Sequence, residues 1–218
     1  CDFSGTTSWT NEGDCGGSEE FDSVTGTPTI GSGVGVAAAA HSAATYGEES
    51  WTNTDNPTTH YKFKFKTDEI DGNDDADFIR LLFFVDGSTG ICYLAMSGDN
   101  SGTNKGKLRT RCDDIGGDAS AYTSTAIVEN TEYWIGVSIH QHATTGWTKI
   151  WITTTDRSSS SFTGAEREVF SENLDTSNDS VYIDKARFGI SYNNMDHTVT
   201  ATFDDFQVDD DTAYGADP

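Results

Sequence analysis

The sequence predicts an all-β protein in which two antiparallel sheets pack face to face as a β-sandwich or jelly roll. Three observations lead to this prediction. Apolar and polar residues alternate with the period of a strand in about eleven or twelve short runs. Segments rich in Gly, Asn, Asp and Ser separate these runs and are typical of turns. The period of a helix is almost absent, so we expect very little helix.

The most informative stretch is residues 133–155, YWIGVSIHQHATTGWTKIWITTT, which predicts a hairpin with two different faces. One face is aliphatic and belongs in a core. The other carries rings, a hydroxyl and basic groups, and supplies the candidate ligand-binding residues Trp134, Ser138, His140, Trp147, Lys149 and Trp151. Flat rings beside hydrogen-bonding groups suit a sugar ring. The alternative is that the tryptophans lie beneath a neighbouring loop or subunit.

A turn centred between Thr144 and Thr145 would place His140 opposite Lys149 and Ser138 opposite Trp151. The predicted platform depends on this alternation, because residues of one parity share one face of a strand.

The chain of 218 residues fits one large β-domain covering residues 1–218, with residues 1–35 as a loose N-terminal arm. Within TPTIGSGVGVAAAA we expect a possible edge strand weakened by glycines. HYKFKFKTDEI alternates strictly between aromatic residues and lysines, and the lysines are typical of an edge strand that is protected against pairing with another chain. FIRLLFFVD is almost continuously apolar, which predicts a central strand covered on both sides.

The formal net charge of −23 restricts the partners of this protein. Such a field repels phosphate backbones and anionic lipid, so we expect no nucleic-acid partner. It also argues against an anionic polysaccharide unless cations bridge the two. No stretch approaches the roughly 20 apolar residues of a membrane span.

The four cysteines show no CxxC metal pattern. Folding GDNSGTNKG about Gly102 brings Cys92 and Cys112 opposite each other on neighbouring strands, and Cys1 and Cys15 would then staple the N-terminal arm. Two disulfides imply an oxidising compartment, hence a secreted or surface-exposed protein. Four buried thiols are the alternative.

No signal peptide is present, so we interpret the chain as a mature or trimmed form. A cysteine at position 1 also raises the possibility of a lipoprotein whose first residue carries lipid. An arbitrary end of the chain explains it equally well.

The segment DEIDGNDDAD carries Asp71, Asn73, Asp75 and Asp77, a spacing similar to that of calcium-binding loops. Its glycine stands at the second position and no bidentate Glu follows at the right distance. We therefore expect a solvated acidic turn.

The order of these pieces resembles the concanavalin A-like lectin/glucanase superfamily, and within it the laminin-G-like jelly rolls. The resemblance is carried by FIRLLFFVDGSTGICYLAM, KLRTRC, NTEYWIGVSIHQHATTGWTKIWIT and TFDDFQVDD, and it covers roughly residues 60–210. The similarity lies in the order and periodicity of the strands more than in invariant residues, so it supports the fold better than an activity.

The resemblance implies a structural calcium ion where the first and last strands meet. Asp204 or Asp205 would supply a carboxylate from the final strand, with Asp2 as the second oxygen donor. The alternative is an N-terminal loop held by hydrogen bonds without metal.

The superfamily also contains enzymes. The Glu-x-Asp-x-x-Glu strand of its retaining glucanases is missing, because AEREVFSE has the wrong spacing. LRTRC, SIHQH and FGISYNN resemble the Arg, Gln-x-His and Tyr strands of alginate lyases, with Arg109 or Arg111, His140 and Tyr192 as candidates. A zinc site from His140 and His142 would need a third ligand such as His60 or His197.

With no catalytic pair, two non-enzymatic functions compete. One is a calcium-stabilised, extracellular, lectin-like domain that binds a polysaccharide or glycan through the hairpin residues. The other is a structural subunit of an extracellular or particle-surface assembly, in which the same face packs on a neighbour. A polysaccharide lyase is a third, weaker alternative.

Overall fold

The computed structural model describes residues 21, 23–32, 34–50, 57–74, 76–87, 89–100, 102–112, 119–176 and 182–209. Cys1, Asp2, Cys15 and Asp75 lie outside this part of the chain. Over the described residues the all-β prediction is confirmed: the chain forms strands and one short 3-10 helix. No helix in the described part is long and apolar enough to cross a bilayer.

Thirteen strands are present among the described residues. Their bounds are β1 Ser23–Thr25, β2 Thr29–Gly31, β3 Val34–Ala39, β4 Thr45–Ser50, β5 Thr58–Thr67, β6 Phe78–Asp86, β7 Thr89–Ser97, β8 Leu108–Arg111, β9 Tyr133–His140, β10 Gly146–Thr153, β11 Arg167–Leu174, β12 Lys185–Asn193 and β13 Val199–Asp209. The 3-10 helix η1, Gly164–Glu166, precedes β11.

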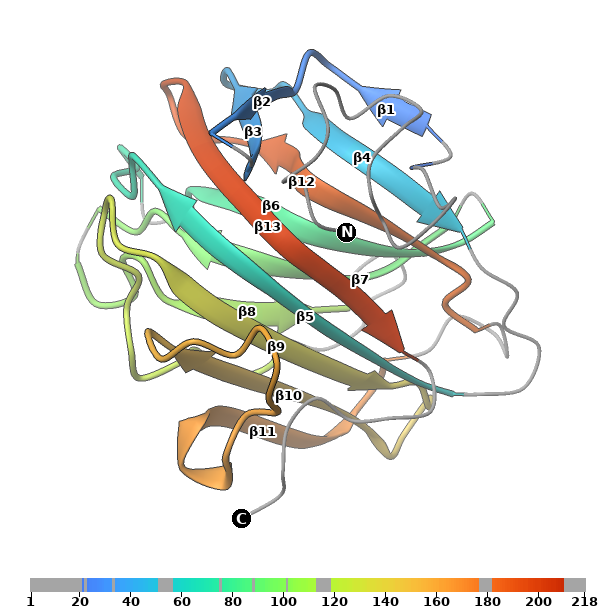
Figure 1. Ribbon diagram of the computed structural model, residues 1–218. Coiled ribbons are helices and arrows are strands. Elements are labelled where there is room, and N and C mark those ends of the chain that lie inside the picture. The colour runs from blue at the N-terminus through green and yellow to red at the C-terminus, as the bar shows by residue number, and fades with distance from the viewer. Residues whose placement is uncertain are drawn as a thin grey trace.

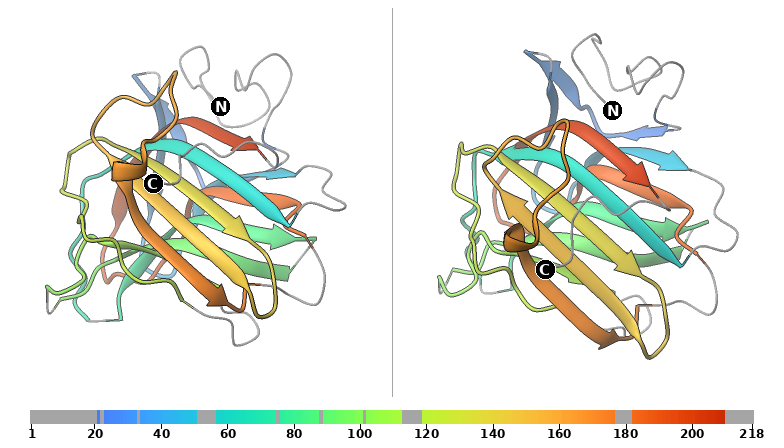
Figure 2. Two further views of the ribbon diagram at one scale, coloured as in Figure 1. Left: turned by 90° about the horizontal axis from the view of Figure 1, so that it is seen from below. Right: turned by 60° about the horizontal axis from the view of Figure 1, so that its bottom comes forward.

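The strands form two antiparallel sheets that stack as two layers (Figures 1 and 2). The six-stranded sheet has the order β1-β4-β12-β6-β7-β8, and the seven-stranded sheet has the order β11-β10-β9-β5-β13-β3-β2. Each sheet therefore has one face in the core between the layers and one outer face.

The core consists of the inward residues of both sheets, and its centre is aromatic. Phe188 on β12 contacts Phe63 on β5 and Phe203 on β13, with ring centroids 5.4 and 5.1 Å apart. All three rings are fully buried. The aliphatic face of the predicted hairpin joins the same core, as expected from its alternation.

Two predictions about strand position have different outcomes. FIRLLFFVD is indeed central, as β6 between β12 and β7. HYKFKFKT is β5, in the middle of the seven-stranded sheet, so its lysines do not guard an edge. Lys64 instead contacts Asp204 across the sheet, at 3.0 Å between Nζ and Oδ2. Alternating lysines cannot distinguish an edge from a central strand whose neighbour supplies carboxylates.

Part of the predicted N-terminal arm, residues 1–35, belongs to the two sheets. β1 pairs with β4, and β2 forms an edge strand beside β3. Phe21, which precedes β1, is buried and stacks on Phe188 at 6.4 Å. Residues 1–20 lie outside the described part of the chain.

The predicted hairpin forms as β9 and β10, but with a different register. His140 pairs with Trp147, Lys149 with Ser138, and Trp151 with Gly136. The turn is longer than expected, because His142 Nδ1 accepts the backbone N–H groups of Thr144 and Thr145 at 3.1 and 3.0 Å. The shift is two residues, so the composition of each face is unchanged.

A disulfide joins Cys92 on β7 to Cys112 just after β8, as predicted from the intervening turn. Both cysteines are buried in the main core. The predicted partner pair, Cys1 and Cys15, lies outside the described residues.

Replacing both cysteines, Cys92→Ala with Cys112→Ala, should lower the free energy of unfolding by about 3 kcal/mol, because the bridge closes a loop of 20 residues. Urea denaturation of the two proteins measures the difference. A loss below about 1 kcal/mol would show that the sheet register alone holds β8 in place.

Candidate functional site

The outer face of the hairpin, which we call the hairpin face (Trp134, Ser138, His140, Trp147, Lys149 and Trp151), is partly covered. Trp134 and Trp151 are only 4% and 1% exposed. Phe162, from the segment between β10 and η1, lies on them and forms with them a small cluster separate from the main core. The expectation that these two tryptophans are accessible is therefore wrong. They lie beneath a loop of the same chain.

Trp151→Ala should lower the free energy of unfolding by about 3–5 kcal/mol, because it empties a buried site between the sheet and Phe162. Trp147→Ala, the matched control on the same strand, removes a half-exposed ring and should cost no more than about 2 kcal/mol. Urea denaturation measures both values, and equal losses would contradict this assignment.

The accessible part of the hairpin face is an aromatic strip near the sheet edge. His140 and Trp147 stack at 5.5 Å with their planes 10° apart. Phe170 on β11 contacts Trp147 edge-on at 6.4 Å and is 42% exposed. Lys149 Nζ lies 4.5 Å from the Trp147 ring and 5.0 Å from the Phe170 ring. Phe170 was missed from the sequence because the register of β11 was not predicted.

The remaining polar groups of the hairpin face bond to β5. Ser138 Oγ lies 2.6 Å from His60 Nδ1, with both residues buried. His140 Nδ1 lies 2.8 Å from Thr58 Oγ1. The pKa of His140 is lowered, mainly by burial and to a smaller extent by the charge of the nearby His142. Within the described residues no group that includes a histidine meets the distances of a three-ligand metal site. The zinc alternative has no support from this geometry.

The candidate calcium ligands Asp204 and Asp205 lie on β13 beside a lysine. Lys64 Nζ is 3.0 Å from Asp204 and 3.9 Å from Asp205. Burial lowers the pKa of Lys64, but the hydrogen bond and charge of Asp204 outweigh it, so the net pKa is raised. The single charge of Lys64 offsets only one of these two carboxylates, and its ammonium group would compete with Ca²⁺ for Asp204. The calcium site stays a prediction.

The acidic turn after β5 is tied down rather than fully solvated. Asp77 is buried, and its Oδ2 accepts the backbone N–H groups of Asn73 and Asp74 at 2.7 and 3.0 Å. Glu69 and Asp71 belong to the same acidic segment, and their carboxylate oxygens lie within 4.8 Å of one another and of that of Glu129.

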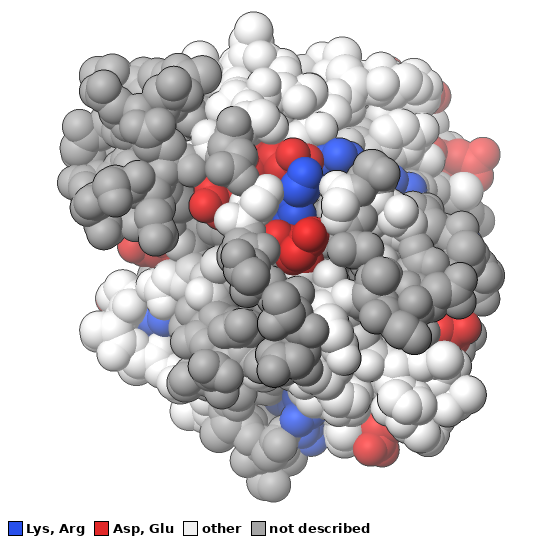
Figure 3. All heavy atoms as spheres, turned by 90° about the vertical axis from the view of Figure 1, so that its right-hand side faces the viewer, with Lys and Arg blue, Asp and Glu red and all other residues white. Residues whose placement is uncertain are grey.

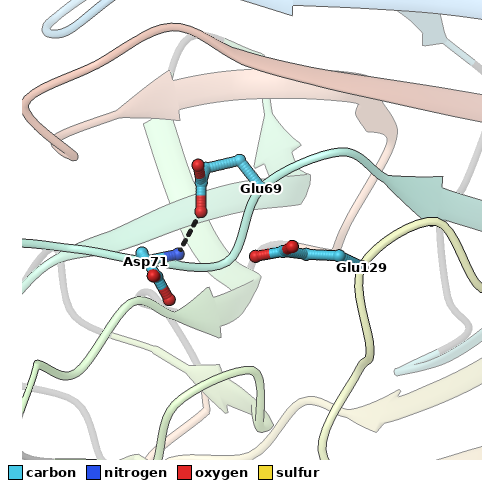
Figure 4. Close-up of side chains that lie close together, drawn as sticks. All are labelled: Glu69, Asp71 and Glu129. Carbon is cyan, nitrogen blue, oxygen red and sulfur yellow. Dashed lines mark hydrogen bonds between the residues drawn. The ribbon is translucent and has the colours of Figure 1, made fainter.

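Figure 4 shows that Glu129 reaches toward Glu69 and Asp71 from a separate loop. Asp71 also pairs with Lys105. Glu69 Oε1 accepts the backbone N–H groups of Ile70 and Asp71. Local partners therefore account for much of this cluster.

The outer face of the six-stranded sheet presents a regular array that the sequence analysis did not identify. Two rows of residues run across four strands in register. One row is Tyr192, Arg80, Ala95 and Arg109, and the other is Arg187, Phe83, Tyr93 and Arg111. Together with Tyr46, Phe78 and Tyr122 we call these residues the arginine–aromatic face. Four of the six arginines in the chain lie here; the other two are Arg157 and Arg167.

Aromatic rings hold the guanidinium groups of this face. The Arg80 guanidinium lies 4.3 Å from the Tyr93 ring and 5.3 Å from the rings of Phe83 and Tyr192. Arg109 lies 4.6 Å from the Tyr122 ring. Because neighbouring strands are about 4.8 Å apart, the backbones of Arg80 and Arg109 are about 10 Å apart across β7. Ala95 lies between them on β7, and its small side chain does not protrude between the two arginines.

At the other end of the face, β4 and β12 are joined by ion pairs. Glu48 accepts from Arg187 Nε at 2.8 Å and contacts Lys185 Nζ at 3.2 Å. β4 ends and β12 begins on the right-hand side of the view in Figure 1. On that side, Lys and Arg atoms form a small group with Asp and Glu atoms around it (Figure 3).

Comparison with solved structures identifies the architecture. The chain is similar to the alginate lyase from Klebsiella pneumoniae with a TM-score of 0.55 and 10% identity, over 84% of this chain and 83% of that chain. The fold is a jelly-roll β-sandwich. It is also similar to the cellulose-induced protein Cip1, with a TM-score of 0.54 and 11% identity, over 89% and 88% of the two chains.

A third jelly-roll neighbour is the binding domain of botulinum neurotoxin serotype C1, with a TM-score of 0.58 and 9% identity. The match covers 86% of this chain but only 43% of that chain. Searches with protein-family models and against curated proteins find no match. These likenesses are consistent with the concanavalin A-like resemblance, and at such low identity they show the fold alone.

Within the jelly roll, the candidate lyase residues separate onto two faces. Arg109, Arg111 and Tyr192 lie on the arginine–aromatic face of the six-stranded sheet. His140 lies on the outer face of the seven-stranded sheet, on the opposite side of the core. These residues therefore cannot act together on one substrate.

The ion pairs of Glu48 predict a specific acid sensitivity. Burial raises the pKa of Glu48, but hydrogen bonds and charges from Arg187 and Lys185 outweigh it, so the net pKa falls below 4.5. Its stabilising effect is therefore present above about pH 4.5 and is lost as the pH falls through the lowered pKa.

Glu48→Gln should lower the melting temperature at neutral pH and flatten its decline between about pH 5 and pH 3. Melting curves across this range compare the two proteins. A decline as steep as that of the wild type would show that other carboxylates cause the acid sensitivity.

Proposed function

We propose that this protein is a non-catalytic carbohydrate-binding domain, and that its arginine–aromatic face binds an acidic polysaccharide. The observation that carries the proposal is the pair of in-register rows that gathers Arg80, Arg109, Arg111 and Arg187 on one sheet face.

The chemistry of the face suits carboxylate groups on an extended polymer. A guanidinium group binds a carboxylate through two parallel hydrogen bonds, and a ring beneath it fixes its plane before the ligand arrives. The Nε atom of Arg80 is buried and has no hydrogen-bond acceptor. The nearby hollow, lined by Arg109, Tyr122 and Phe78 but also by Asp77, holds about 30 Å³, so a ligand would lie along the sheet instead of entering this hollow.

The strong negative charge of the chain argues against an anionic ligand in general, but its effect on this face is reduced by screening. The net charge of −23 is an average over the molecule, whereas salt screens exposed charges beyond roughly 8–10 Å. A ligand on the arginine–aromatic face therefore meets local guanidinium groups first. The neighbouring structures include alginate lyases and botulinum neurotoxin type C, whose cell entry depends on interaction with two ganglioside molecules. Those names support a sugar-related use of the fold.

The expected location is extracellular or surface-exposed. A buried disulfide between β7 and β8 forms and persists in oxidising compartments. Polysaccharides of cell walls and matrices are encountered there.

Arg80→Gln and Arg109→Gln should each weaken binding of alginate and polygalacturonate by at least about tenfold, because each removes a charge-assisted pair. Binding by the wild type should weaken in high salt, and neutral cellohexaose should not displace alginate from this face. Arg80→Lys keeps the charge but loses the planar fork, so it should be intermediate. Isothermal titration calorimetry measures all of these affinities.

Arg167→Gln is the matched control, because Arg167 lies against Phe170 on the other sheet and its loss should leave binding unchanged. Equal weakening in this control would overturn the assignment of the face. Release of unsaturated uronate products would make the protein a lyase. A wild-type particle that dissociates in the arginine variants would instead make this face a subunit contact.

A further inference from the structure

The second feature that can bind a ligand lies on the opposite sheet, where Phe162 covers the hairpin face. The segment of residues 154–163, which we call the strap, connects β10 to η1. Apart from Phe162 and the half-buried Arg157, every residue of the strap is exposed. Phe162 is only 1% exposed, so it is the main anchor of the strap on the sheet.

The seat of Phe162 is a notch in the sheet with Gly136 as its floor. Gly136 pairs with Trp151 on one side and with Lys62 on the other. A Cβ atom at Gly136 would lie 2.7 Å from Cε2 of Phe162, so only glycine leaves room for the ring. Trp151 stacks on Phe162 at 6.3 Å with planes 29° apart. Trp134 completes the wall. The notch thus holds one phenyl ring, that of Phe162.

The notch also contains a polar group that a phenyl ring cannot satisfy. Nε1 of Trp151 is buried and has no hydrogen-bond partner. Lys62, whose Nζ lies 5.7 Å from the Trp134 ring, donates to the Arg157 carbonyl at 3.0 Å. Because Nε1 is a donor, a ring that carries hydroxyl acceptors fits the notch better than Phe162 does.

Besides the Lys62 bond to the Arg157 carbonyl, bonds to Glu166 fasten the root of the strap. Arg157 Nε donates to Glu166 Oε2 at 3.1 Å, and the backbone N–H of Thr163 donates to the same atom at 2.7 Å. These bonds lie within the strap and η1, and none involves β9. The strap can therefore lift Phe162 from Gly136 without breaking the β9–β10 ladder.

We propose that the notch over Gly136 is a binding site for one pyranose ring of a neutral polysaccharide, and that Phe162 occupies it as a displaceable lid. Trp134 and Trp151 stack on the apolar face of the sugar, and Trp151 Nε1 donates to one of its hydroxyls. This site is independent of the acidic-polysaccharide face and does not require it.

The test titrates full-length wild type and Phe162→Ala with cellohexaose, xylohexaose and mannohexaose, followed by calorimetry and tryptophan fluorescence. Phe162→Ala opens the notch and should bind at least one of these hexaoses tenfold or more tighter than the wild type. Adding Trp134→Ala to this variant should abolish the gain. Phe170→Ala removes an exposed ring outside the notch and should behave as the wild type.

Far-UV circular dichroism establishes that each variant is folded. Should Phe162→Ala fail to fold, Glu166→Gln replaces it, because it loosens the root of the strap and leaves the notch intact. A folded Phe162→Ala or Glu166→Gln that binds none of the hexaoses more tightly than the wild type would overturn the proposal, and Phe162 would then be ordinary packing. Neither outcome changes binding of alginate by the opposite face.

Discussion

The aromatic contact between the two sheets is the interaction on which the rest of the molecule depends. Phe188 of the six-stranded sheet lies against Phe63, Phe203 and Phe206 of the seven-stranded sheet. Once these rings are inside, strand alternation sends their neighbours outward on both sheets. Arg187, next to Phe188, is thereby placed on one outer face, and Lys62 and Lys64, beside Phe63, on the other. The core thus determines which side chains each surface can offer.

The two outer faces handle positive charge in different ways. On the seven-stranded sheet, Lys64 is neutralised by Asp204 and Asp205 within the sheet. On the six-stranded sheet, Arg80 and Arg109 lie on aromatic rings. Rings stabilise a cation without cancelling its charge. Arg167 also lies on a ring, that of Phe170, on the seven-stranded sheet. The two faces therefore differ in number, because the rows of the six-stranded sheet gather four guanidinium groups.

Gly136 has the opposite role to a bulky core residue, because its missing side chain creates a place for another ring. Phe162 fills that place and buries Trp134 and Trp151. Only part of the hairpin face, His140, Trp147 and its neighbours, stays accessible. The same pair of strands thus combines a surface strip with a covered notch.

The sequence alone determined the local periodicity and its direct consequences. Alternating runs and the turns between them were sufficient to predict a β-sandwich or jelly roll, the aliphatic side of β9 and the Cys92–Cys112 bridge, because these depend on neighbours along the chain or across one hairpin. The burial of Trp151 and the rows that join Arg80 to Arg109 depend on which distant segments meet. Phe162 covers a strand from outside it, and β12, β6, β7 and β8 align only in the folded sheet. Strand order and register come from packing of the whole core, so only the tertiary structure could decide them.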